Sequence, residues 1–388
     1  MGKGRAGALA ALFLAALALR PQIVGLGPLI PSIQDDLDTS HAVVGLLGTI
    51  PVLCMGLFAP PAALLLKRVG TRAAIGGCLF LIASFGLLRM ASPQVALVVA
   101  FTFPIGVGMG FAGALMPVFV KEHFPDRPAF ATGVYTTGIQ LGSALSSGLA
   151  VPVAHAAGGW RGSLAAFSAV TGGLFLAWLV LTRREPPHAR VEARVPRLPL
   201  RSGMAWLLVV LFGSMGLTYY GLNAWLADSF VERGWSEASA GGLIAVLNLA
   251  TLPSSMLVPW LADRHGSRRR LMIVLGVMLV TGVAGLVLFP GGAYAWITLV
   301  GLANGAMFPM VLTLPLDVSH RPDRVGSIVG MMLGVGYLIA ATSPFTLGAV
   351  RDATGSFTGA MWALVGFATV WLLATLPLSR ERLQRARA

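Results

Sequence analysis

The sequence predicts an all-α membrane protein with twelve transmembrane helices arranged as two pseudo-symmetric bundles of six. Of its 388 residues, 56% are apolar and only 11% are charged, whereas soluble globular proteins carry about 25% charged residues. Apolar runs long enough to cross a bilayer follow one another with short connectors. Motifs of the first half also recur in the second half. A lipid bilayer is therefore expected to surround most of this chain.

Crossing the hydrocarbon core takes about 20 mostly apolar residues in a helix. The first such run resembles a secretory signal, because Lys3 and Arg5 precede it, but it stays apolar past Arg20 to Ile30. We therefore expect it to remain as the first span. The twelve predicted spans are 7–31, 42–66, 73–91, 95–120, 129–152, 163–182, 203–227, 239–262, 271–289, 294–316, 325–349 and 359–378.

The distribution of Lys and Arg predicts the orientation. With the N-terminus in the cytoplasm, the cytoplasmic segments collect 23 of the 28 basic residues and the opposite side collects 4. Positive charge favours the cytoplasmic side, so both termini are predicted to lie there, in a bacterial inner membrane. The net charge of +13 is spread over short connectors rather than one soluble face, which argues against nucleic-acid binding.

The longest connector divides the chain. Residues 183–202 are rich in Pro and Arg and lack an apolar period, which is typical of a linker at the membrane surface. It separates a predicted N-terminal bundle (1–182) from a predicted C-terminal bundle (203–388) that ends in a short basic cytoplasmic tail. One chain, with the bilayer and a small-molecule substrate as partners, is the expected working unit.

The two halves repeat at an offset near 196 residues. The run Lys67–Arg72 corresponds to Asp263–Arg268, and Pro125–Arg127 corresponds to Pro322–Arg324. Coincidence does not readily produce several matches at the same offset. A parallel duplication of six spans is the arrangement of the major facilitator fold, in which the solute site lies between the halves near the membrane midplane.

The repeated loops predict a cytoplasmic latch. Asp263 is an acidic residue among arginines, and a negative charge is favoured at a helix N-terminus. We therefore expect it to reach the start of the fifth span near Arg127 and to close the cytoplasmic side when the protein opens outward. The first half has a lysine in its place, so its latch should be weaker. The alternative is that these residues serve only as topological anchors. The residues concerned are Asp263, Arg264, Gly266, Arg268, Arg127, Lys67 and Arg72.

Arg20 is the one charge predicted to lie near the middle of a span. It follows the start of its run by about 13 residues, or about 20 Å at 1.5 Å per residue. A charge at that depth costs at least ~2.5–3.5 kcal/mol and needs a partner. With no carboxylate at that depth, we predict an anionic or polarised substrate as the partner, because a guanidinium binds such groups through two hydrogen bonds. The alternative is that Arg20 binds carbonyl groups freed by the neighbouring prolines.

Further polar side chains lie within the predicted spans. Tyr219 and Asn223 share a helix face, and Tyr220 takes the place of Tyr219 if that helix is rotated. Each candidate could instead make a hydrogen bond between helices, worth about 0.6 kcal/mol. No arrangement of residues indicates a metal, a cofactor or an enzymatic nucleophile. The candidates for the substrate site, besides Arg20, are Tyr135, Gln140, Tyr219, Asn223, Asn248, Asn304 and Tyr337.

Five segments carry a resemblance to a known family. They are Leu19–Pro21, Gly27–Pro31, Phe124–Arg127, Thr132–Tyr135 and Gly158–Arg161. Together they resemble the cyanate/2-nitroimidazole transporter family of the major facilitators, and the resemblance implies functional roles for Arg20 and Tyr135. Ala18 and Gly113 depart from the family pattern, which often has asparagine at both places, so the resemblance does not fix the substrate.

The sequence thus favours a secondary or facilitative transporter for a small, anionic or strongly polar organic solute. The halves would rock around a site that contains Arg20. An efflux pump for small aromatic drugs is an alternative, suggested by the Tyr and Met content of the spans. A membrane sensor that keeps the fold without transport is an alternative of another class, and the short connectors leave little room for a signalling domain.

Overall fold

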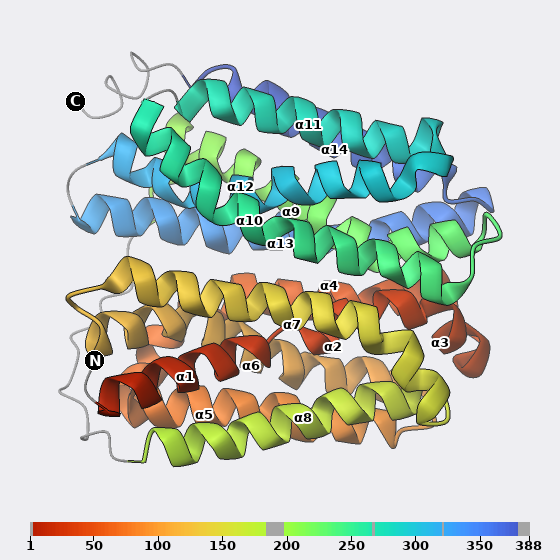
Figure 1. Cartoon of the computed structure of the whole chain (residues 1–388), viewed down its shortest axis with the longest axis horizontal. Helices are drawn as coiled ribbons and strands as arrows, with labels where there is room; N and C mark the ends of the chain where they lie inside the picture. The colour runs from red at the N-terminus through yellow and green to blue at the C-terminus, as the bar shows by residue number, and fades with distance from the viewer. Residues whose placement is uncertain (1–2, 184–197, 266–267, 320–321, 379–388) are drawn as a thin grey trace.

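The computed structural model describes residues 3–183, 198–265, 268–319 and 322–378, and all regular structure in these ranges is helical (Figure 1). Residues 184–197, most of the predicted linker, lie outside them. The first group of elements is α1 (Lys3–Leu17), α2 (Pro21–Val24), η1 (Gly27–Leu29), α3 (Ile30–Leu37), α4 (His41–Phe58), α5 (Ala62–Met90), α6 (Val95–His123), α7 (Pro128–Ala156) and α8 (Trp160–Leu181). The second is α9 (Gly203–Val231), α10 (Glu237–His265), α11 (Arg268–Leu288), η2 (Pro290–Gly292), α12 (Ala293–Val318), α13 (Pro322–Thr354) and α14 (Thr358–Thr375).

Eleven helical segments of the described ranges are long and apolar enough to cross a membrane. The remaining predicted span is α7, which is 29 residues long. Its many Gly, Ser and Thr residues lower its hydropathy, and it packs against α1 and α10. With α7, the chain has the twelve spans that the sequence predicts.

The first span is broken rather than continuous, which corrects the predicted helix 7–31. Helix α1 ends at Leu17 and α2 ends at Val24, four residues before Pro21 and Pro28 respectively. A proline ring clashes with the carbonyl group four residues earlier and has no N–H to donate. The span therefore continues as the short segments α2, η1 and α3, as far as Leu37.

Helix α5 is kinked at Gly70, in the loop predicted between the second and third spans. Gly70 has φ 75° and ψ 165°, a conformation that glycine adopts without steric cost. The segments on either side of Gly70 are helical, so the second span runs from α4 into the start of α5. The equivalent Gly266 of the second half lies outside the described residues.

The helices form two groups, with α1–α8 on one side of the molecule and α9–α14 on the other (Figure 1). We call them the first and second halves. Between the halves, α4 runs along α13 and α7 runs along α10. The backbones approach closely: a Cβ at Gly45 would lie 2.6 Å from the carbonyl oxygen of Pro344, and one at Gly348 would lie 2.6 Å from that of His41.

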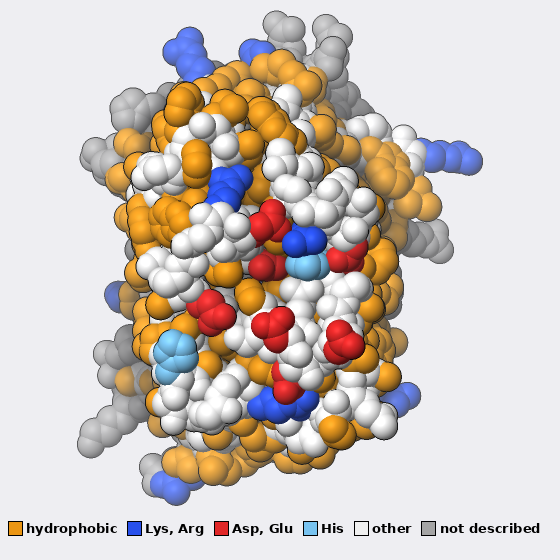
Figure 2. Space-filling model, turned by 90° about the vertical axis from the view of Figure 1, so that its right-hand side faces the viewer, with side chains coloured by type: hydrophobic (Ala, Val, Ile, Leu, Met, Phe, Trp, Pro, Cys, Tyr) orange, Lys and Arg blue, Asp and Glu red, His pale blue; other side chains and the backbone are white. Residues whose placement is uncertain are grey.

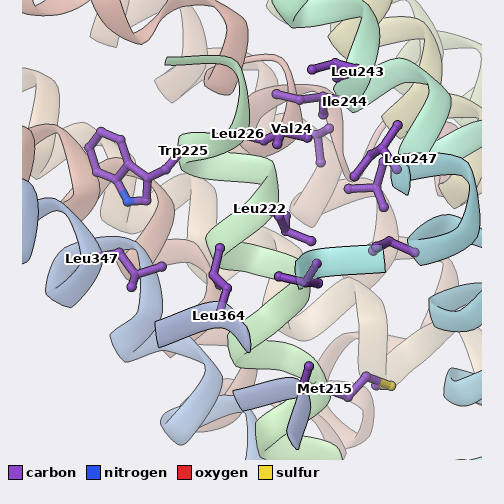
Figure 3. Packing of buried hydrophobic residues seen from close by; sticks show 14 of the residues in the cluster. Val24, Met215, Leu222, Trp225, Leu226, Leu243, Ile244, Leu247, Leu347 and Leu364 are labelled. Carbon is purple, nitrogen blue, oxygen red and sulfur yellow. The ribbon is translucent and has the colours of Figure 1, made fainter. Parts of the chain in front are cut away.

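The largest hydrophobic cluster extends across both halves. Figure 3 shows Val24 of α2 beside Leu222 and Leu226 of α9, with Ile244 and Leu247 of α10 close by. The broken segment of the first span therefore packs on the second half, and this contact holds the residues next to the break in place.

Helix α1 begins and α14 ends at the same end of the molecule (Figure 1). We call this the termini end and the opposite one the far end. Carboxylate side chains gather on the far end (Figure 2). Two of them pair with arginines, Asp36 with Arg161 at 3.0 Å and Glu232 with Arg351 at 3.1 Å.

Candidate functional site

The break in the first span places Arg20 between the halves. Arg20 stands between α1 and α2, and its side chain is half-buried. Its Nη1 donates a hydrogen bond of 2.9 Å to the hydroxyl oxygen of Tyr220 on α9. The guanidinium carbon lies 5.7 Å from the centre of the Tyr220 ring. Among the described residues no carboxylate pairs with Arg20, so its contacts are with phenols rather than with a counter-ion.

Three tyrosines lie near the guanidinium group. Tyr219 and Tyr337 lie close to Arg20, as Tyr220 does. The rings of Tyr219 and Tyr220 meet edge to face at 5.3 Å, and Tyr337 meets Phe212 edge to face at 4.9 Å. The sequence named Tyr219 as a candidate for the substrate site, with Tyr220 in its place if the helix is rotated. The structure puts Tyr220 on Arg20 and directs Tyr219 elsewhere.

Tyr219 is hydrogen-bonded to the side-chain amides of Asn248 and Asn223, which we call the amide chain. Its hydroxyl donates to Oδ1 of Asn248 on α10 at 2.7 Å, and Nδ2 of Asn248 donates to Oδ1 of Asn223 at 3.0 Å. Nδ2 of Asn223 donates to the backbone oxygen of Tyr219 at 2.8 Å. The predicted shared face of Tyr219 and Asn223 is therefore present, and Asn248 completes a closed set of hydrogen bonds.

Gln140 extends this network to the other half. Its Nε2 donates to Oγ1 of Thr251 at 2.7 Å, and Oγ1 of Thr251 donates to the backbone oxygen of Asn248 at 2.6 Å. Helix α7 of the first half is thereby joined to α10 of the second half. Thr251 was not among the sequence candidates, because a single threonine on an apolar helix carries no distinctive signal.

Two predicted residues stand apart from these hydrogen bonds. Nδ2 of Asn304 donates to the backbone oxygen of Val300 on its own helix at 3.4 Å, and the residue is 5% exposed. Tyr135 packs at the edge of the second hydrophobic cluster, in the first half, and lies near Tyr337. The structure thus brings Arg20, Gln140, Tyr219, Asn223, Asn248 and Tyr337 together, with Tyr135 at the margin and Asn304 outside.

A small cavity adjoins the site. Its lining comes from the broken segment (Ile23–Ile30), the start of α4 (Val44–Gly48) and α9, where it includes Tyr220 and Asn223. Its volume of about 20 Å³ is room for about one water molecule. This cavity is too small to hold an organic solute in the conformation described.

Arg89 is a second buried arginine, at the end of the predicted span 73–91, where it is counted among the four basic residues of the outer side. Its side chain is 0% exposed. Nη2 donates to Oε1 of Gln22 at 2.6 Å, and Nη1 donates to Oγ1 of Thr102 at 3.3 Å. Nε2 of Gln22 donates to Oγ of Ser168 at 2.9 Å. This chain of hydrogen bonds fixes the broken segment two residues after Arg20. Arg89 is close to the end of an apolar run, so hydropathy alone does not reveal its burial.

The predicted latch lies partly outside the described residues, because the side chains of Asp263 and Arg264, and all of Gly266, are not described. The proximity of Asp263 to Arg127 stays a prediction. Nη1 of Arg268 pairs with Oδ2 of Asp317 at 2.7 Å within the second half. In the first half Nε of Arg72 donates to Oγ1 of Thr182 at 3.0 Å, while Lys67 and Arg127 are exposed.

Comparison with known proteins identifies the class. Residues 9–344 match the family model of the Major Facilitator Superfamily, and the chain belongs to this superfamily, in its group of cyanate and 2-nitroimidazole transporters. It is 30% identical over 363 residues to the cyanate transport protein CynX of Escherichia coli (strain K12), covering 93% of this chain and 94% of that protein. It is also 30% identical over 378 residues to the 2-nitroimidazole transporter of the same strain, covering 97% and 95%.

The fold also resembles the folds of solved transporter structures. A bacterial homolog of the human lysosomal transporter Spinster, in an inward-facing and unoccupied conformation, superposes with a TM-score of 0.79 at 16% identity, covering 100% of this chain and 99% of that one. As a member of the superfamily, the chain is a multi-pass membrane transporter of small solutes and not an enzyme. Within the described residues, no group of His, Cys, Asp and Glu side chains could hold a metal ion.

Proposed function

We propose that this transporter moves a small organic anion across the bacterial inner membrane by alternating access, with Arg20 as the contact for the anion. The observation that carries the proposal is a half-buried guanidinium group between the halves that meets tyrosine hydroxyls and no described carboxylate. A charge of this kind costs at least ~2.5–3.5 kcal/mol in a bilayer. An anion that arrives with the solute offsets this cost.

The surroundings of Arg20 suit a flat, polar solute. A guanidinium group presents its N–H groups in a planar fork that fits a carboxylate or a similar anion. Tyrosine hydroxyls and asparagine amides supply further donors, and tyrosine rings offer flat faces. Two relatives are named for cyanate, which is a small anion, and for 2-nitroimidazole, which is a flat ring with oxygen acceptors.

Alternating access follows from where the halves meet. Arg20 with Tyr220 and Gln140 with Thr251 both bond across the halves near the middle of the spans. A cavity of about 20 Å³ is too small for an organic anion, so the halves must separate to admit one. We place both termini in the cytoplasm and take a single chain as the working unit. Since no carboxylate is predicted within the spans, we favour facilitated movement or exchange.

Two other functions are kept as alternatives. Efflux of small aromatic drugs is favoured by the rings of Tyr219, Tyr220 and Tyr337 near the site. A sensor without transport is favoured by no particular contact, and the short connectors argue against it. Aromatic amines or neutral aromatic rings would be the ligands of an efflux pump, whereas an anion site distinguishes acids from their neutral counterparts.

A thermal-shift screen tests the anion site. The purified protein is heated with matched acid and amide pairs, such as formate with formamide and benzoate with benzamide, and with cyanate and 2-nitroimidazole. We expect acids to raise the melting temperature more than their amides in the native protein, and this difference to vanish in Arg20→Gln. Arg183→Gln, which removes an exposed arginine, is the matched control. Equal stabilisation by acids and amides would reject the proposal.

A further inference from the structure

His41 at the far end lies between two carboxylates of the other half. It is the first residue of α4, and its neighbour Ser40 caps that helix. Its Nδ1 lies 2.8 Å from Oδ1 of Asp352 on α13, and its Nε2 lies 3.5 Å from Oδ2 of Asp228 on α9. The histidine and Asp228 side chains are only 16% and 10% exposed. We call these three residues the histidine junction.

Both ring nitrogens of His41 thus face carboxylate oxygens. A neutral imidazole donates from one nitrogen and presents a lone pair at the other, whereas an imidazolium donates from both. Oδ2 of Asp228 makes no hydrogen bond in the described structure, so its nearest positive partner is the histidine ring. The arrangement therefore fits the protonated ring, with one proton held among the three groups.

Asp352 has other partners that fix its place. Its two carboxylate oxygens accept from the backbone N–H groups of His41 at 3.1 Å and Ala42 at 2.8 Å. These groups belong to the N-terminus of α4, where a negative charge is favoured. One side of the His41 ring packs on Trp225 at 5.6 Å and another on Phe357 at 5.5 Å. The ring is therefore held between two aromatic groups as well as two carboxylates.

Other charged groups near the junction are paired or exposed. Arg351, next to Asp352, pairs with Glu232 of the turn after α9. On α3, Asp36 pairs with Arg161. Neither pair involves Asp228 or Asp352, the two carboxylates that face His41. At the far end, the charged groups of the packed elements are thus Asp228, Glu232 and Arg233 from the α9 region, Arg351 and Asp352 from α13, and Asp35, Asp36 and Asp38 from the α3 region.

The same contacts close the far end. His41 and Ala42 belong to the first half, whereas Asp228 and Asp352 belong to the second. Beside them, Gly348 lets α13 approach the carbonyl oxygen of His41 to a distance that no Cβ would permit. Any opening of the far end must separate α4 from α13, and so must pull His41 away from both carboxylates.

We propose that His41, Asp228 and Asp352 form a proton-binding site that fastens the far end closed, taking up one proton from the solution on that side on closure and releasing it on opening. In the open form the ring faces water, where a histidine titrates near ~6.5. A group that holds its proton only in the closed form favours that form as the pH falls. Acid therefore favours a closed far end. The inference rests on the proposed alternating access but not on the identity of the solute.

Distances between spin labels test the proposal without a transport assay. Labels are attached at Gln94→Cys and Ala238→Cys, exposed positions at the far end of the two halves, after Cys54 and Cys78 are replaced by alanine. In lipid nanodiscs at pH values from about 5 to 9, we expect the longer, open distance to gain population as the pH rises. The open-to-closed ratio should change by up to about tenfold per pH unit.

Substitutions in the histidine junction and at a control histidine identify the groups that cause the pH response. His41→Gln and Asp352→Asn should each remove most of the pH response, whereas His155→Gln, an exposed histidine of α7 at the same end, should keep it. A pH-independent distribution in the native protein, or an unchanged response in His41→Gln, would overturn the proton site. Movement on addition of sodium cyanate without any response to pH would overturn the proton site alone. No movement under either condition would overturn alternating access as well.

Discussion

Replacing Arg20 by glutamine should separate anion binding from protein stability. The guanidinium group donates to Tyr220 at 2.9 Å and has no described carboxylate partner. Hydrogen bonds to charged groups contribute about 1.5–3 kcal/mol each. Loss of one or two such bonds to a bound anion, about 2–3 kcal/mol, weakens binding by about 30- to 150-fold. Removing a buried charge that lacks a counter-ion should leave the melting temperature of the empty protein equal or higher.

Calorimetric titration of the purified protein with the most stabilising acid measures the binding, and a thermal scan of the empty protein measures the stability. Arg20→Lys keeps the charge but not the planar fork, so its affinity should lie between those of the native protein and Arg20→Gln. Arg183→Gln should match the native protein in both measurements. If Arg20→Gln lowers the melting temperature by several degrees yet binds the acid unchanged, Arg20 has a structural role and the reasoning fails.

Two further substitutions probe the junction of the halves and the amide chain. Gly45→Ala places a Cβ 2.6 Å from the carbonyl oxygen of Pro344, so thermal scans should show that the protein loses about 1–3 kcal/mol of stability. Gly77→Ala, whose Cβ meets nothing within 4 Å, should be neutral. Equal effects of the two substitutions would refute the close approach of the halves at Gly45. Asn248→Ala leaves two hydrogen-bonding partners unpaired and should cost about 1–3 kcal/mol, whereas Asn304→Ala should cost less in the same scan. The reverse order would show that the amide chain does not stabilise the fold.

The sequence was sufficient to predict the number of spans and the place of Arg20 within the first of them. These features depend on apolar length and on one charge within an apolar run, both of which are visible residue by residue. The breaks after Leu17 and Val24 are explained by Pro21 and Pro28, each four residues later, although an unbroken apolar run favours one continuous helix.

The contacts between helices could not be read in the same way. Whether Tyr219 or Tyr220 faces Arg20 depends on the rotation of α9, which hydropathy does not define, because α9 is apolar around most of its circumference. Arg89 and His41 lie at the ends of apolar runs, where a charge is usually solvated. Their burial follows from neighbours that are distant in the sequence, such as Gln22 and Asp352.

Solute counterflow in liposomes tests the central claim, transport of a small anion through a site that contains Arg20. Liposomes that contain the protein are loaded with an unlabelled acid, chosen as the most stabilising one, and diluted into a trace of its labelled form. We expect a transient accumulation of label with the native protein and with Arg183→Gln, and a loss of most of it with Arg20→Gln. Accumulation of label by Arg20→Gln at the native rate would contradict a role for Arg20 in transport. Absence of accumulation by the native protein with every stabilising acid would contradict the transport of small anions.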